Sequence, residues 1–203
     1  MDRRKELVRR AYEETAAAFA AARRSGGAEA PWLERFMLAL PPGSPVLDLG
    51  CGNGEPIART LAAAGFAVTG VDFSREQVRR ARAQVPSGRF VVADMATVEM
   101  EAGGFCGVIA WDSVFHLPAA EQARLFARVR RWLAPGGQFV VTLGGTGGEV
   151  YTDHLGVAIY YSALDVATAV QTITRAGFLV QECVLDDPGD HGHLIVVAMA
   201  SSS

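Results

Sequence analysis

Three aspartates in the first half of the chain are placed for ligand chemistry. Asp48, Asp72 and Asp94 each stand at the end of a short apolar run, and Asp94 follows Asp72 by 22 residues. A carboxylate can accept both hydroxyls of a ribose through charge-assisted bonds, and it also balances an ammonium or sulfonium charge. An acid at a strand end is often only a helix N-cap, but three in succession favour a bound small molecule that carries a sugar and a positive charge.

A glycine-rich loop follows Asp48 and predicts a cradle for that molecule. Residues 46, 47 and 49 around Asp48 are apolar, and residues 50–54 then carry glycine at every second position. Glycine adopts backbone angles that other residues avoid, and it lets a ligand lie against the main chain. Dinucleotide-binding loops have the spacing G-x-G-x-x-G, whereas a Glu-Pro pair here occupies the place of the third glycine. Asp48 would repel a pyrophosphate, although Asp72 by itself suits NAD as well.

The rest of the chain alternates between strand and helix patterns, as in a doubly wound α/β sheet. The last two strands are joined by a turn too short for a crossover helix, so they must be antiparallel neighbours. We therefore predict a seven-stranded, mostly parallel sheet with an antiparallel C-terminal hairpin strand and helices on both faces. A flexible loop (144–148) and a short insertion (149–162) are expected after the fifth strand. The predicted strands are 45–49, 67–71, 89–92, 107–111, 138–143, 178–185 and 193–199, and the predicted helices are 1–25, 31–40, 55–65, 75–84, about 125–133 and 163–176.

The glycine loop resembles motif I of the class I S-adenosylmethionine (SAM)-dependent methyltransferases. Residues 133–137, Leu-Ala-Pro-Gly-Gly, are similar to the L-x-P-G-G turn before the fifth strand of that family. Gly-Glu-Pro-Ile-Ala after the loop and Phe-His-Leu-Pro after the fourth strand resemble a subgroup of small bacterial enzymes often encoded beside biosynthetic genes. The resemblance is strong over about 40–145. It implies a single SAM-dependent methyltransferase domain over 1–203, with N-terminal cap helices (1–40), a SAM-binding core (41–145), and a substrate-side insertion with the C-terminal hairpin (146–203).

The resemblance also implies roles in cofactor binding. Asp72 would accept from the ribose hydroxyls, Phe73 would form an apolar wall for adenine, and Asp94 would accept from the adenine amino group. A tyrosine of the cap helix would close over SAM, although plain packing of an amphipathic helix explains this residue equally well. The implied cofactor-binding residues are Tyr12, Asp48, Gly50, Cys51, Gly52, Asn53, Gly54, Asp72, Phe73, Asp94, Met95 and Trp111.

Methyl transfer from SAM is an in-line displacement that needs an aligned acceptor, exclusion of water and, for a protonated acceptor, a base. His116 is the first candidate base, because it follows the fourth strand and the ordinary pKa of histidine is near neutrality. His154 and Tyr161 are predicted pocket residues, and Tyr160 and Asp112 are further candidates. Packing alone is the competing interpretation of each side chain. The subgroup commonly has a Trp-Ser pair after the insertion, where this chain has Tyr-Tyr-Ser, so no substrate follows from the resemblance.

We therefore predict a SAM-dependent methyltransferase acting on an O, N or C nucleophile of a small molecule, of the kind met in secondary metabolism. The product formed from SAM would be S-adenosylhomocysteine (SAH). One alternative is a SAM fold used for non-methylating chemistry or sensing. An NAD-type oxidoreductase is disfavoured by the loop spacing, by Asp48 and by the closing hairpin.

Composition bears on partners and location. The net charge of −3 gives no basic surface for nucleic acid, and no apolar run approaches the roughly 18 residues that would cross a membrane. Three cysteines without metal-like spacing indicate reduced thiols, so we expect a cytoplasmic protein. We also expect a monomer or a homodimer. Lys5 is the only lysine among many arginines, which we attribute to coding bias. No metal is expected: the acids of 186–190 are interpreted as solvated loop residues, and His193 as the start of the last strand.

Overall fold

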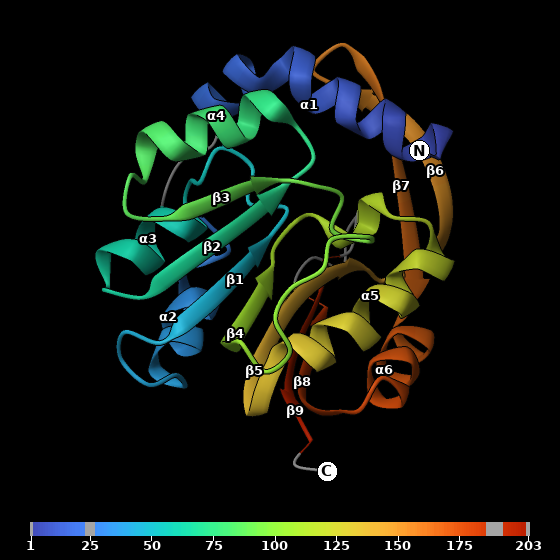
Figure 1. Ribbon diagram of the computed structural model, residues 1–203. Helices are drawn as coiled ribbons and strands as arrows, with labels where there is room; N and C mark the ends of the chain where they lie inside the picture. Colours follow the sequence, from blue (N-terminus) through green and yellow to red (C-terminus); the bar gives the residue numbers. More distant parts are fainter. Residues whose placement is uncertain (1, 23–26, 186–192, 202–203) are drawn as a thin grey trace.

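The chain is built on a seven-stranded sheet whose strands follow the order β3-β2-β1-β4-β5-β9-β8 (Figure 1). The structure, a computed structural model, describes residues 2–22, 27–185 and 193–201. Strands β1 to β5 are parallel, β9 pairs antiparallel with β5, and β8 pairs antiparallel with β9. This arrangement confirms the predicted fold class. The bounds are β1 Pro45–Leu49, β2 Ala67–Asp72, β3 Arg89–Val92, β4 Phe105–Ala110, β5 Leu133–Gly144, β8 Phe178–Leu185 and β9 His193–Ala200.

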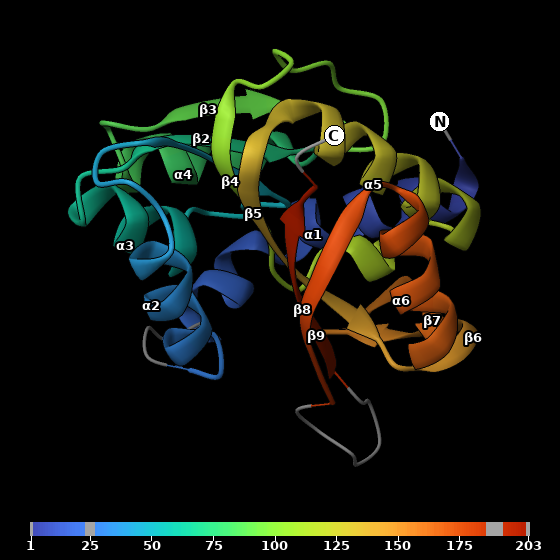
Figure 2. The same ribbon diagram turned by 90° about the horizontal axis from the view of Figure 1, so that it is seen from below.

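Helices cover both faces of the sheet (Figure 2). One face carries α2 (Ala30–Leu38), α3 (Ile57–Ala63) and α4 (Arg75–Gln84), and the other carries α5 (Ala119–Trp132) and α6 (Val166–Arg175). Ser74 and Asp165 start α4 and α6, because each side chain accepts a hydrogen bond from a backbone N–H of the first turn. A further helix, α1 (Arg3–Ala22), runs above the carboxyl ends of the central strands (Figure 1). It extends from α4 to a hairpin formed by β6 (Thr146–His154) and β7 (Val157–Asp165).

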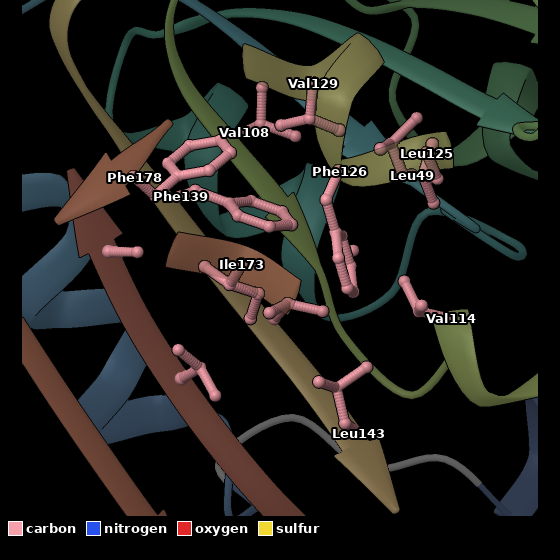
Figure 3. Packing of buried hydrophobic residues seen from close by; sticks show 14 of the residues in the cluster. Leu49, Val108, Val114, Leu125, Phe126, Val129, Phe139, Leu143, Ile173 and Phe178 are labelled. Carbon is pink, nitrogen blue, oxygen red and sulfur yellow. The ribbon is translucent and has the colours of Figure 1, made fainter. Parts of the chain in front are cut away.

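Two apolar cores hold the strand ends in place. On the α5–α6 face, Phe126, Phe139, Ile173 and Phe178 pack around the sheet (Figure 3). Full burial of one such side chain contributes roughly 1.5–3 kcal/mol. The second core, on the α2–α4 face, includes Trp32, Ile57, Val78 and Phe90. Because both faces of the central strands are buried, their carboxyl ends are held on a rigid support.

The predicted loop (144–148) and insertion (149–162) are wrong for residues 146–165. These residues form an antiparallel hairpin of β6 (Thr146–His154) and β7 (Val157–Asp165). The two linking residues, Leu155 and Gly156, have φ of 53° and 86°, which is typical of the type I′ turn that matches the twist of a hairpin. β-Branched and aromatic residues in both strands favour this structure, and the inner strand packs against α1. Glycine is uncommon in strands, so the glycines at 147 and 148 led to the prediction of a loop.

Smaller differences concern element ends. Strand β5 begins at Leu133, inside the predicted turn, because Leu133 pairs with Phe105 before the register shifts. Helix α6 begins at Val166 and not at 163, since the preceding residues belong to β7. In the part of the chain that the structure describes, no helix is both long and apolar enough to cross a membrane.

Candidate cofactor site

A cavity lies at the carboxyl ends of β1, β2 and β4, beneath α1. It encloses about 740 Å³, part of it open to solvent. This is the place at which open α/β sheets bind ligands. Its lining combines the glycine loop, acids at strand ends and apolar walls. The lining residues are Tyr12, Phe19, Asp48, Gly50, Cys51, Gly52, Glu55, Ile57, Asp72, Phe73, Ala93, Asp94, Met95, Trp111, Asp112, Ser113, His116 and Leu117.

The first glycine of the loop cannot be replaced by a residue with a side chain. The N–H groups of Gly50 and Cys51 both donate to the Val71 carbonyl, at 2.7 and 3.1 Å, and fold the loop over β2. Gly50 has a φ of +75°, and a Cβ added to it would lie 2.8 Å from the Ser113 Oγ and closer still to the Ser113 Cβ. Ser113 is itself fixed by donating to the Leu49 carbonyl at 2.7 Å. The cradle therefore requires glycine at position 50.

Asp72 ties the end of β2 to this loop. Its Oδ2 accepts from Gly52 N at 3.0 Å and its Oδ1 from Ser74 N at 2.8 Å. Burial raises the pKa of Asp72 to about 6, against the opposite effect of these backbone hydrogen bonds, and the nearby Glu13 carboxylate adds to the rise. An ionised carboxylate offers about four lone pairs, so two further donors can be accepted. Asp72 can thus hold the loop and two ligand hydroxyls at once.

The other predicted cofactor residues divide into two groups. Asp48 is buried in β1 and lines the cavity, Asp94 follows β3, and Phe73, Met95 and Trp111 supply apolar walls. Asn53 and Gly54 do not line the cavity. The Asn53 Oδ1 accepts from Glu55 N at 3.1 Å, which shapes the loop from within. A side chain at Gly54 would meet Ala81 of α4, so this glycine serves close packing.

His116 lines the cavity and is held in a fixed tautomer. Its Nδ1 is 2.9 Å from the Tyr160 carbonyl, which can only accept, so Nδ1 carries the proton. Its Nε2 is 2.9 Å from the Tyr12 hydroxyl and must then accept from it. Burial lowers the pKa of His116 to about 4. The ring is therefore neutral at physiological pH, with its remaining lone pair directed at Tyr12.

His154 and Tyr161 lie one layer behind the cavity lining. The His154 ring is 5.3 Å from the Tyr12 ring and 6.0 Å from the Phe19 ring, centroid to centroid. The Tyr161 ring lies 4.7 Å from that of His116, and burial raises the pKa of its hydroxyl. Both residues support groups that line the cavity.

Three functional residues of α1, the predicted cap helix, were not predicted from the sequence. Phe19 lines the cavity, Glu13 accepts from two N–H groups at the start of α4, and Lys5 forms ion pairs beneath the helix. Residues 5, 12 and 19 are spaced by seven, which places them on one helix face. That spacing and the single lysine of the chain were the available signals.

Asp112 and His193 complete the rim at the end of β4. Asp112 is held at a φ of 51°, and its N–H donates to the Thr142 Oγ1 at 2.6 Å. The His193 Nδ1 lies 4.0 Å from the Asp112 carboxylate.

Among the residues described, no group of three or more His, Cys, Asp or Glu side chains could hold a metal ion. The acids and histidine of 186–191 lie outside the described residues.

Comparisons with known proteins agree with this geometry. Residues 46–137 match the family model described as a methyltransferase domain. The 27-O-demethylrifamycin SV methyltransferase of Amycolatopsis mediterranei is 33% identical over 52% of this chain and 40% of its own. The S-adenosyl-L-methionine-dependent Diels-Alderase iccD of Talaromyces variabilis is 38% identical over 51% of this chain and 37% of its own. The chain therefore spans less than half the length of these relatives.

A solved structure resembles nearly the whole chain. It is the Burkholderia thailandensis 1,6-didemethyltoxoflavin-N1-methyltransferase with bound 1,6-didemethyltoxoflavin and SAH. The TM-score is 0.75 at 19% identity, with 99% of this chain and 92% of that chain covered. At this identity the likeness concerns the fold. The chain thus has the fold of a methyltransferase structure that binds SAH, and residues 46–137 within it match the methyltransferase-domain model.

Proposed function

We propose that this chain is a SAM-dependent methyltransferase that transfers the methyl group to an O, N or C atom of a small molecule and releases SAH. One observation carries the proposal: a glycine loop, in which position 50 has no room for a side chain, lines a cavity together with buried or half-buried acids at the ends of successive strands. The carboxylates can accept hydrogen bonds from ribose hydroxyls and balance a sulfonium charge, whereas Asp48 and Asp72 would repel a pyrophosphate.

The proposed placement of SAM follows from the chemistry of the lining. Asp72 would accept the ribose hydroxyls, Asp94 the adenine amino group, and Phe73 would pack on the adenine ring. Asp48 would balance positive charge near the glycine loop, where the methionine end would lie over bare main chain. Asn53 and Gly54 would act indirectly, by shaping the loop and its packing on α4.

The acceptor would enter between the cofactor site and the aromatic group formed by Tyr12, Phe115, His116 and Tyr161. SAM supplies an electrophilic methyl group, and the chain must align the acceptor, exclude water and remove a proton. We propose His116 as the base. An acceptor hydroxyl that replaces Tyr12 as donor to Nε2 would give its proton there. A base of low pKa suffices, because an oxygen becomes strongly acidic as it is alkylated.

His116→Gln is expected to lower kcat about ten-fold while leaving the SAM dissociation constant nearly unchanged. The glutamine amide can donate to the Tyr160 carbonyl and accept from Tyr12, so it keeps the contacts and removes the base. General bases typically contribute about 10²–10⁴-fold, and less when the pKa lies far below the working pH. Steady-state kinetics with calorimetric SAM binding checks this. Unchanged kcat in His116→Gln, with a loss only in His116→Ala, would leave His116 a positioning role.

SAM affinity is expected to fall as the pH is lowered through about 6. The ribose hydroxyls donate to Asp72, so SAM binds the ionised carboxylate, whose pKa is raised to about 6 without ligand. Below that pH each unit should cost up to about ten-fold in affinity. His116, with a pKa lowered to about 4, stays neutral over most of this range. Calorimetry from pH 5 to 8 measures the slope, and Asp72→Asn should abolish it; a slope that persists in Asp72→Asn would contradict the assignment.

A second candidate function is SAM-dependent chemistry without methyl transfer. It is favoured by the similarity to the Talaromyces variabilis Diels-Alderase. The two functions differ in what happens to the bound donor. Incubation with candidate phenol, amine and acidic C–H acceptors should release SAH in step with methylated product. Tight SAM binding with no SAH formed from a broad acceptor panel would favour the second function.

We propose a cytoplasmic location, supported by the free thiols of Cys51, Cys106 and Cys183.

Cys51 lines the cavity, and burial raises its pKa well above the ordinary value, with Asp48 and Asp72 adding to the rise. A thiol in this state is a poor nucleophile. Cys51 is therefore proposed to fill space beside the cofactor.

A further inference from the structure

Lys5 is buried, which is rare for a lysine unless it is paired. Only 5% of its surface is exposed. Its Nζ lies 2.6 Å from the Asp94 Oδ2 and 2.6 Å from the Glu121 Oε2. The two acids lie 89 and 116 residues further along the chain. A single ammonium thus joins the cap helix, the loop after β3 and the first turn of α5.

The cap helix is held over the cavity at several other points, so the seat of Lys5 is well defined. Glu13 accepts from Arg75 N at 2.7 Å and from Glu76 N at 3.1 Å, at the start of α4. Tyr12 donates to His116, and Arg4 pairs with Glu149 of β6 at 3.0 Å. The helix is therefore anchored to both sides of the cavity as well as through Lys5.

Lys5 stays charged in this seat. Burial by itself lowers the pKa of Lys5, but the hydrogen bonds to Asp94 and Glu121 outweigh it and the net shift is upward. The group then consists of two carboxylates around one ammonium. If the ammonium were removed, two carboxylates would face each other without a cation, and their repulsion would move Asp94 from its present position.

Asp94 is the member of this group that lines the cavity. Its Oδ1 accepts from Ala96 N at 2.9 Å and its Oδ2 accepts from Lys5, so both oxygens are held in place as acceptors. An ionised carboxylate accepts hydrogen bonds and cannot donate. It matches the 6-amino group of adenine, and it repels the carbonyl oxygen of a 6-oxopurine.

On the basis of the proposed SAM site, we propose that Lys5 determines its nucleobase specificity: by holding Asp94 as an ionised acceptor, it makes this wall select a 6-aminopurine over a 6-oxopurine. Lys5 is a positioning residue in this role, since it acts through Asp94. The proposal therefore predicts the ratio of the dissociation constants for a 6-aminopurine and a 6-oxopurine ligand, and not only the affinity for one of them.

The test compares SAH with its deaminated analogue, S-inosylhomocysteine, by calorimetry on the whole chain. Wild type is expected to prefer SAH by about 10–100-fold, as a hydrogen bond to a charged group warrants. In Lys5→Met this preference should fall by about ten-fold. The matched control is Arg10→Met, which removes an exposed cation–acid pair with Glu14 on the same helix and should keep the wild-type ratio.

Two further variants keep the proposal testable if Lys5→Met does not fold. Asp94→Asn should lose the preference, because an amide can turn either its oxygen or its NH₂ group to the purine. Glu121→Gln should keep the preference, because Lys5 still pairs with Asp94. An unchanged ratio in Lys5→Met or Asp94→Asn, or a lost ratio in Glu121→Gln, would overturn the proposal. Failure of wild type to bind SAH would instead refute the proposed function.

Discussion

Replacing Asp72 with asparagine is expected to weaken SAM binding by about 1.5–3 kcal/mol, the usual worth of hydrogen bonds to a charged group. The amide keeps one acceptor oxygen, while the N–H groups of Gly52 and Ser74 already bond to the carboxylate. It cannot satisfy these groups and two ribose hydroxyls together. Calorimetric titration of both proteins with SAM measures the difference.

Asp165→Asn is the matched control for this variant. Asp165 also accepts from a backbone N–H at a helix start, Thr168 N at 2.9 Å, but it lies at the start of α6 and does not line the cavity. Its replacement should leave SAM affinity unchanged. SAM affinity that is equal in wild type and Asp72→Asn would refute the assignment of Asp72 to the ribose.

Replacing Gly50 with alanine is expected to destabilise the folded protein by about 2–4 kcal/mol. Two costs combine: a φ of +75° disfavours any residue with a Cβ, and that Cβ would collide with Ser113. Relief of the collision would have to move Ser113 away from the Leu49 carbonyl, and so disturb the junction of β1 and β4. Urea unfolding followed by circular dichroism measures the loss.

Gly65→Ala separates these two costs. Gly65 has a φ of +88° and nothing within 4 Å of an added Cβ, so it carries the backbone cost of roughly 1 kcal/mol alone. We expect Gly50→Ala to be clearly the more destabilising of the two. Equal losses would show that the loop tolerates a side chain at position 50 and would contradict the collision with Ser113.

Most of the fold was predictable because its signals are local. Runs such as residues 67–71 are apolar and short, and glycine or proline separates them from helices with one apolar face. The closing hairpin followed from the length of one turn. The β6–β7 hairpin was missed because β6 is almost wholly exposed, so burial imposes no apolar pattern on it, and because its glycines at 147 and 148 are typical of a loop.

The site was predictable to the extent that it depends on strand ends. Asp48, Asp72 and Asp94 meet at one edge of the sheet because parallel neighbours end together, and ten of the twelve predicted cofactor residues line the cavity. The role proposed for Lys5 depends on tertiary structure, because its partners Asp94 and Glu121 lie in the loop after β3 and in the first turn of α5. The same holds for His116, whose tautomer is set by a carbonyl 44 residues away.

The most direct test of this account is calorimetric titration of the whole chain with SAM, SAH and NAD under identical conditions. We expect one equivalent of SAM and of SAH to bind, with no heat of binding from NAD. Binding of NAD, or binding of neither SAM nor SAH by folded protein, would contradict the account.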